Sequence, residues 1–134
     1  MRDVKMDPGK ALEGFARIVA RRISPVLPDG FVVWDERGSI MIRSTTDPIG
    51  QKSHLSALVT PDPDCQSIRI GVLNVLNTLQ DYISEALTIP WPSTDHEMAL
   101  PDVVCAEGTL RFWYGDGTRP VLAFEPIDIS YWIE

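Results

Sequence analysis

The last third of the chain most constrains its fold, because two runs of apolar and aromatic residues there flank a glycine-rich turn. The runs are Thr109–Tyr114 and Val121–Phe124, and Gly115–Thr118 lies between them. Aromatic and β-branched residues favour strands, and Asp-Gly is a strong signal for a tight turn between two strands. We therefore predict a β-hairpin. An apolar tail over residues 126–134 follows it and must pack on its own fold or on a partner.

Aromatic residues of this region are the strongest candidates for an interaction surface. Phe112 and Trp113 are adjacent, so in a strand they point to opposite faces of the sheet. One of them can fill the core while the other lies on the second face, and exposed Trp and Tyr clusters are common at protein interfaces. The alternative is that a helix or the tail covers that second face. The candidate interaction residues are Trp113, Tyr131, Trp132 and Ile133.

Two segments carry apolar residues at the spacing of an amphipathic helix. The first starts at residues 7–8, a capping Asp and a Pro suited to the first helical position, and stops before Pro25. The second is capped by Asp62 or Asp64 and stops before Pro90. The apolar positions of the second helix are Ile68, Val72, Val75, Leu76, Leu79, Ile83 and Ala86.

Short segments rich in strand-forming residues flank these helices. Residues 54–60 alternate loosely, and a short helix opened by Ser53 is the alternative there. Residues 93–102 predict a polar connection, with Trp91 folding back over the end of the second helix. The expected strands cover residues 31–34, 40–43, 54–60, 103–106, 109–114 and 121–124. We expect one α+β domain over residues 1–134, in which helices pack on a twisted antiparallel sheet in the order α-β-β-β-α-β-β-β.

The charge of the chain argues against two classes of partner. The sequence holds 12 Lys and Arg against 19 Asp and Glu, for a formal net charge of −7. Such a surface repels a phosphate backbone on average, so we expect no nucleic-acid partner. No apolar stretch approaches the roughly 20 residues that span a bilayer. The N-terminal residues also lack the apolar core of a signal peptide, so we expect no membrane association.

The two cysteines, Cys65 and Cys105, lie far apart in the sequence and outside any metal-binding or redox motif. We expect two reduced thiols that behave as small apolar residues, which fits a cytoplasmic protein, and a disulfide is the alternative. Cys65 falls near the start of the second helix, where a thiolate is stabilised, so it is the candidate reactive thiol. A structural cysteine in the first helical turn is the alternative to that role.

No catalytic, metal-binding or nucleotide-binding motif is present in the sequence. The histidines are His54 and His96, and neither has further ligands at the spacing of a metal site. The glycines of Gly115–Gly117 lack the spacing and the following helix of a phosphate-binding loop. We therefore expect no catalytic residue, no metal and no cofactor.

Two segments of the C-terminal half together resemble a family of small actinobacterial proteins. The first is Gln80–Pro92, and the second is Leu110–Asp116 followed by Pro120–Leu122. This resemblance implies no particular activity and gives no residue a role. The expected order of helices and strands is also similar to that of type III secretion chaperones, which are small, acidic and often dimeric. That similarity implies a binding role through topology alone.

Together these observations favour a non-enzymatic protein that acts through interaction, as an adaptor or as a chaperone-like homodimer. Its acidic charge, its lack of catalytic motifs and the aromatic residues near its C-terminus support this expectation. The alternative is a domain that binds a small ligand in a pocket between the sheet and the helices. A cavity lined by Trp and Tyr side chains would favour that alternative.

Overall fold

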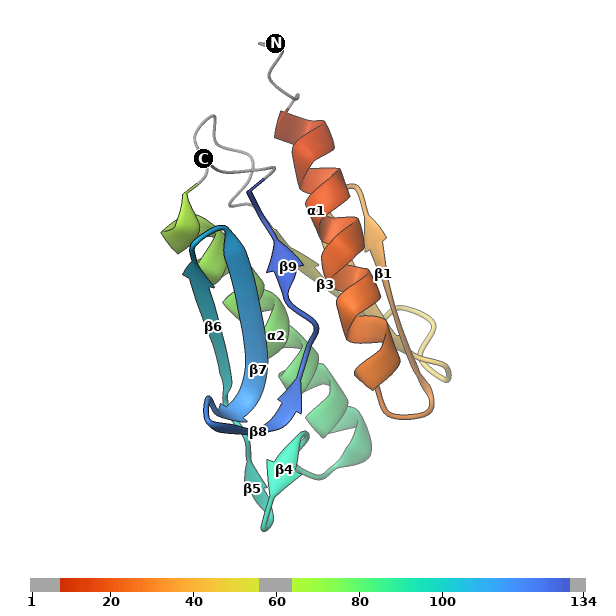
Figure 1. The fold of residues 1–134 in the computed structure, drawn as a ribbon. Coiled ribbons are helices and arrows are strands. Elements are labelled where there is room, and N and C mark those ends of the chain that lie inside the picture. The colour runs from red at the N-terminus through yellow and green to blue at the C-terminus, as the bar shows by residue number, and fades with distance from the viewer. Residues whose placement is uncertain (1–7, 56–63, 131–134) are drawn as a thin grey trace, which may run out of the picture.

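The described part of the protein, residues 8–55 and 64–130 of a computed structural model, contains two long helices and several antiparallel sheets (Figure 1). The helices are α1 (Pro8–Ile23) and α2 (Cys65–Leu87), and a short 3-10 turn, η1 (Ser24–Val26), follows α1. The first sheet consists of β1 (Phe31–Glu36), β2 (Ser39–Ser44) and β3 (Gln51–His54). The second consists of β6 (Pro101–Ala106), β7 (Thr109–Asp116), β8 (Arg119–Ala123) and β9 (Ile127–Asp128). The α+β class expected from the sequence is confirmed.

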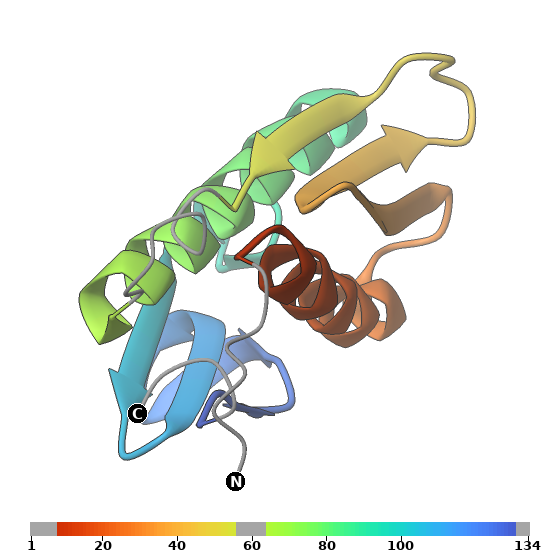
Figure 2. The ribbon, with the colours of Figure 1, turned by 90° about the horizontal axis from the view of Figure 1, so that it is seen from above.

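Strands β1–β3 and strands β6–β9 form two separate sheets that both contact α2, instead of one continuous sheet (Figure 2). Helix α2 contacts β6 of the second sheet as well as β2 and β3 of the first, whereas α1 packs on β1 and β2. Each sheet therefore buries one face against helices, and α2 supplies apolar side chains to both. Alternation within a strand predicts which of its residues are buried, but it does not say whether distant strands join.

Two hairpins turn where the sequence places glycines after a polar residue. Arg37 and Gly38 join β1 to β2 with φ angles of 51° and 84°, and Glu107 and Gly108 join β6 to β7 with φ angles of 54° and 76°. Positive φ at both central residues is typical of the tight turns that match the twist of antiparallel strands. At Gly38 a Cβ atom would lie 2.6 Å from Leu12 Cδ2, so this position also lets α1 pack closely on the turn.

A single cluster of buried side chains links the two helices to both sheets. Its largest fully buried members are Tyr114, Phe15, Phe112, Ile23, Ile42, Leu55, Ile68, Leu76, Leu79, Ile83 and Leu110. The Tyr114 hydroxyl donates a hydrogen bond to the Leu76 carbonyl oxygen at 2.8 Å, which satisfies a polar group inside the core. Burial raises the pKa of this hydroxyl well above its usual range, so it stays protonated.

The loops around α2 differ from the sequence expectation in two places. The third strand is Gln51–His54, N-terminal to the expected 54–60, and residues 56–63 lie outside the described part of the chain. Residues 93–102, expected as a connection, hold a small hairpin of β4 (Ser93–Thr94) and β5 (Glu97–Met98). The expected packing of Trp91 over the helix end is confirmed, because Ser84 Oγ accepts from the Trp91 amide at 2.9 Å and the indole contacts the Tyr114 ring.

Replacing the capping residue of α2, Asp64→Ala, should lower the free energy of unfolding by about 1 kcal/mol. Asp64 Oδ1 accepts the Ser67 amide hydrogen at 2.7 Å, and the bonds to Ser67 lower the Asp64 pKa. Alanine would leave that amide without its side-chain partner, whereas Asp64→Asn keeps an acceptor. Urea unfolding of the three proteins checks this, and equal losses for both variants would contradict a capping role.

Candidate functional site

A disulfide joins the two cysteines, so the expectation of reduced thiols was wrong. Cys65 Sγ and Cys105 Sγ are bonded at 2.09 Å, linking the first residue of α2 to β6. The packing of β6 along α2 brings their Cα atoms to 5.5 Å, an approach that the sequence alone does not reveal. Cys65 therefore carries no free thiol in this structure, and its role as a reactive nucleophile is not supported.

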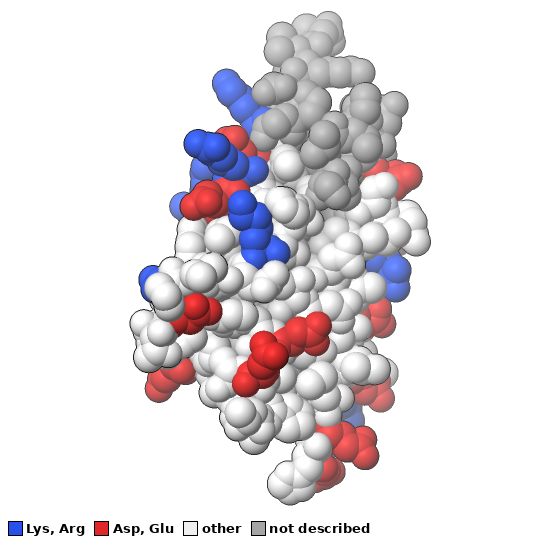
Figure 3. All heavy atoms as spheres, turned by 180° about the vertical axis from the view of Figure 1, so that it is seen from behind, with Lys and Arg blue, Asp and Glu red and all other residues white. Residues whose placement is uncertain are grey.

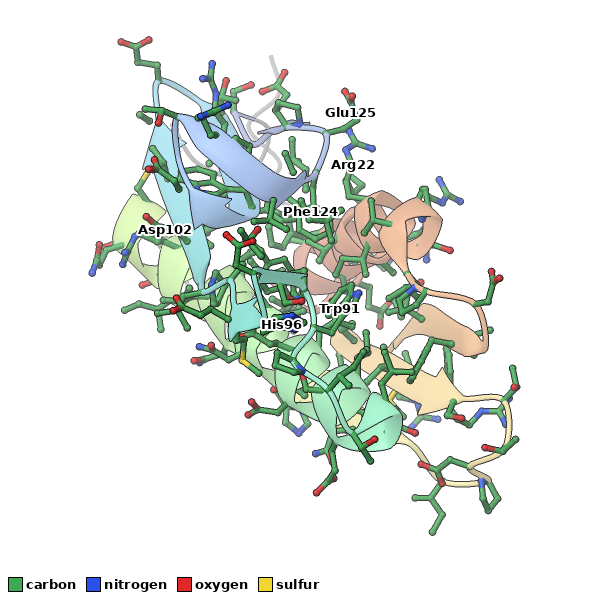
Figure 4. All side chains as sticks on the ribbon, turned by 90° about the horizontal axis from the view of Figure 1, so that it is seen from below. Arg22, Trp91, His96, Asp102, Phe124 and Glu125 are labelled. Carbon is green, nitrogen blue, oxygen red and sulfur yellow. A yellow bond between two sulfur atoms is a disulfide. The ribbon has the colours of Figure 1, made fainter. Side chains whose placement is uncertain are left out.

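The histidines do not form part of an evident catalytic group. His54 is exposed at the end of β3, and its Nδ1 lies 3.0 Å from Ser39 Oγ on the neighbouring strand. His96 lies in the exposed turn between β4 and β5, to the left of Trp91 in the view of Figure 4. Among residues 8–55 and 64–130, no three His, Cys, Asp or Glu side chains are arranged to hold a metal ion. In the same ranges, no helix is long and apolar enough to cross a bilayer.

The outward face of the second sheet, here called the β6–β8 face, is the strongest candidate for a binding surface. Phe112 points into the core, and Trp113 points outward and remains half-buried, as the alternation predicted. Trp113 lies outside the buried cluster and its packing partners. Val104 on β6 and Val121 on β8 are 43% and 38% exposed. The face is turned toward the viewer in Figure 1, on the side of the sheet away from α2.

A shallow groove of about 290 Å³ crosses the β6–β8 face. Most of its lining is apolar, and Arg111 is the charged side chain in it. Its lining includes Val104, Arg111, Trp113, Pro120 and Pro126. The groove therefore pairs an apolar lining with one positive charge.

Local backbone geometry fixes the Trp113 indole in this groove. Its Nε1 donates a hydrogen bond to the Gly115 carbonyl oxygen at 3.0 Å, within an irregularity of the β7–β8 pairing. A Cβ atom on Gly117 would lie 3.1 Å from Trp113 Cζ2, so a glycine there lets the ring lie flat against the turn. The sequence predicted this turn as a tight hairpin, but it did not reveal that the turn orients the indole.

Of the predicted interaction residues, the structure places Trp113, whereas Tyr131, Trp132 and Ile133 lie outside the described residues. The first part of the apolar tail packs on the protein itself. Ile127 and Ile129 are buried, β9 pairs with β7, and the Ile129 amide donates to the Gly108 carbonyl oxygen at 2.8 Å. The tail thus begins as an additional strand of the second sheet.

Arg22 at the end of α1 holds the segment between β8 and β9. Its Nε donates to the Glu125 carbonyl oxygen at 3.2 Å, and its Nη2 donates to the Pro126 carbonyl oxygen at 3.3 Å. Figure 4 shows Arg22 reaching from the helix toward Glu125, with Phe124 beside them. This arrangement gives Arg22 a structural role and fixes Pro126 at the edge of the groove.

A second groove, also about 290 Å³, lies between β3 and α2 and is polar. It is lined by Gln51, Thr78, Asp81, Tyr82 and Glu85. The Tyr82 hydroxyl donates to Asp47 Oδ2 at 2.5 Å and accepts from the Ser44 amide at 2.9 Å, so its hydrogen-bonding groups are already used.

Seen from behind, acidic side chains are dispersed over the surface and Lys and Arg gather at the upper left (Figure 3). Charge therefore marks no single site on that side.

The substitution Tyr82→Phe should raise the pKa of Asp47 toward its ordinary value. The Tyr82 hydroxyl is the main cause of the low Asp47 pKa. A carboxyl with a depressed folded-state pKa stabilises the protein above its unfolded pKa, and this stability is lost as pH falls through the folded pKa. The variant should lose less stability across that acidic range. An NMR titration of the carboxyl groups checks this, with Asp116, whose pKa is lowered by Thr118, as the control. An unchanged Asp47 pKa would contradict the assignment.

Comparison with known proteins gave no relative. No family model matches the chain, and no curated protein or solved structure matches it. The case for a function therefore rests on the geometry of the β6–β8 face.

Proposed function

We propose that this protein is a non-enzymatic interaction domain, an adaptor or chaperone-like protein that binds an apolar segment of a protein partner on the β6–β8 face. The observation that carries the proposal is the position of Trp113. Its indole is held by Gly115 and Gly117 on the outward side of the sheet, beside an apolar groove. Rigid aromatic side chains in such positions are the residues that most often dominate binding energy.

The size of the face favours a short segment over a second folded subunit. Its three main strands have five to eight residues. At about 4.8 Å between strands and about 3.3 Å per residue, they cover roughly 14 by 20 Å. A stable dimer buries about 800 Å² on each partner, well above what this face offers. A homodimer built on this face alone is therefore the less favoured form of the proposal.

Both edges of the sheet disfavour binding by strand addition. Pro120 lies in the edge strand β8 and offers no amide hydrogen for a ladder. On β6 the Val103 carbonyl oxygen already accepts from Arg69 Nε at 2.8 Å. The partner would therefore bind through side chains in the groove.

A display library of short random peptides, selected on the full chain, tests the proposal. We expect enriched peptides whose binding falls about tenfold or more in Trp113→Ala, as for a central aromatic anchor. Val104→Asp provides a second variant in the same groove, in case the first one is poorly folded. Trp34→Ala is the matched control, because Trp34 lies on the outward face of the first sheet, beneath Arg43.

NMR shift changes on peptide binding should cluster on β6, β7 and β8. Two results would contradict the proposal: no enrichment over an unrelated protein, or binding that Trp34→Ala weakens as much as Trp113→Ala does. Circular dichroism of each variant separates a lost surface from a lost fold.

A small ligand remains the second candidate, on a different site from the one expected. The sequence predicted a pocket between the sheet and the helices; the groove between β3 and α2 lies in such a place but is polar, whereas the apolar Trp113 groove lies on the outward face of the second sheet. The Trp113 groove lies just below the range of about 300–1,000 Å³ that is usual for ligand pockets. The Trp113 indole could stack on a planar ring of a ligand. A ligand screen, followed by the same comparison of Trp113→Ala with Trp34→Ala, would detect such binding.

The disulfide also bears on where the protein works. The expectation of a cytoplasmic location depends partly on reduced thiols. Disulfides persist mainly in oxidising compartments and are uncommon in the cytosol. The Cys65–Cys105 bond therefore removes that argument and favours an oxidising environment.

A further inference from the structure

We propose that the segment bound on the β6–β8 face carries an Asp or Glu side chain next to its apolar docking residue, and that Arg111 binds this carboxylate. This inference rests on the proposed function and names the chemistry of the partner. Arginine recognises carboxylates through paired, charge-assisted hydrogen bonds, which add specificity to an apolar contact.

The surroundings of Arg111 are apolar and leave its charge unpaired. Arg111 lies on β7 directly opposite Val104 of β6, and Pro126 lines the same groove. Trp113 follows two residues later on the same face of the strand. Within residues 8–55 and 64–130, Arg111 has no ion pair or hydrogen bond from its side chain. A guanidinium without a partner among these residues is thus exposed beside apolar side chains.

The carboxylates closest in the strand register each contact another partner through one oxygen, Oδ1, and neither forms an ion pair with Arg111. Asp102, opposite Trp113, lies 3.6 Å from Arg69 Nη2 and accepts the Val103 amide hydrogen. Asp128, opposite Thr109, accepts two hydrogen bonds from Ser130, which also lower its pKa. A cation left without either of these anions favours binding an anion from a partner.

The backbone around Arg111 favours a side-chain carboxylate over a free C-terminus. C-terminal carboxylates are usually held by clusters of unpaired backbone amides. Arg111 lies inside the β6–β7 ladder, where it pairs with Val104, and the groove lining includes Pro120 and Pro126, which have no amide hydrogen to donate. A single guanidinium without surrounding backbone amides is better able to bind the side chain of an acidic residue within a longer segment than a C-terminal carboxylate.

A charge-reversal selection tests the inference. Short random peptides are selected in parallel on the full chain and on Arg111→Glu, and the enriched sequences are compared. Arg119→Glu is the matched control, because Arg119 lies on the adjacent strand β8 but outside the groove. We expect Asp or Glu beside an aromatic or aliphatic residue on the natural protein and on Arg119→Glu. On Arg111→Glu we expect Lys or Arg at that place, with the apolar residue kept.

The affinities of one enriched peptide and of its Glu→Gln form measure how much the contact between Arg111 and the carboxylate contributes to binding. The natural protein should bind the Gln form about tenfold more weakly, and Arg111→Ala should bind both forms equally. Peptides that need Trp113 but show no acidic preference would overturn the inference and leave the proposed function standing. No enrichment on any of the proteins would overturn both.

Discussion

Reduction of the Cys65–Cys105 disulfide should lower the free energy of unfolding by about 4 kcal/mol. The bond closes a loop between residues separated by 40 positions, so the reduced unfolded chain gains conformational entropy that the cross-linked chain lacks. For a chain of this length the loss corresponds to a fall in Tm of roughly 10 °C or more. Urea unfolding with and without a phosphine reductant measures the difference.

The double variant Cys65→Ala, Cys105→Ala is the control for that experiment. It should be less stable than the natural protein and should not respond to the reductant. A thiol titration confirms that the reductant has opened the bond. Equal stability of the oxidised and fully reduced natural protein would show that the cross-link does not stabilise the fold.

The disulfide also fixes a strand of the sheet that carries the proposed binding surface. Cys105 lies in β6, one strand of the β6–β8 face, and the bond fixes that strand to the start of α2. Arg69 of α2 holds Val103 and Asp102 of the same strand, and Arg22 of α1 holds the segment that follows β8. Contacts from both helices thus hold the sheet whose outward side carries Trp113, so a partner would meet a preorganised surface.

Features set by nearby residues were the ones that the sequence predicted well. The helix that ends before Pro25, the helix that ends before Pro90 and the hairpin through Gly115–Thr118 each depend on a few neighbouring residues. The opposite directions of Phe112 and Trp113 follow from the geometry of any strand. Trp113 could therefore be chosen as a candidate surface residue before any tertiary contact was known.

Features that join distant parts of the chain were not predictable in this way. The disulfide, the bond from Tyr82 to Asp47 and the separation of the strands into more than one sheet all depend on how α2 packs against β2, β3 and β6. Arg111 carries no motif, and its importance appears only when the register places it among apolar neighbours. The groove is a property of three strands together and has no signature in any one of them.

The substitution Leu79→Ala should lower the free energy of unfolding by about 2–5 kcal/mol, the usual cost of truncating a fully buried leucine. Leu79 is 1% exposed and lies on the face of α2 that forms the core. The loss includes the transfer of the removed methyl groups and the cavity that they leave. Because small domains are stable by only about 5–15 kcal/mol, the upper part of this range would unfold much of the protein at moderate temperature.

Ile70→Ala on the same helix is the matched control, because Ile70 is 47% exposed. Its cost should stay below about 1 kcal/mol, since little buried area is lost and alanine favours a helix. Urea unfolding of both variants under oxidising conditions keeps the disulfide intact in each. The difference between their free energies of unfolding then reports side-chain packing alone. Similar losses for the two variants would mean that the core face of α2 is assigned wrongly. The inward direction of β6 and β7, and with it the outward direction of Trp113 and Arg111, would then need to be assigned anew.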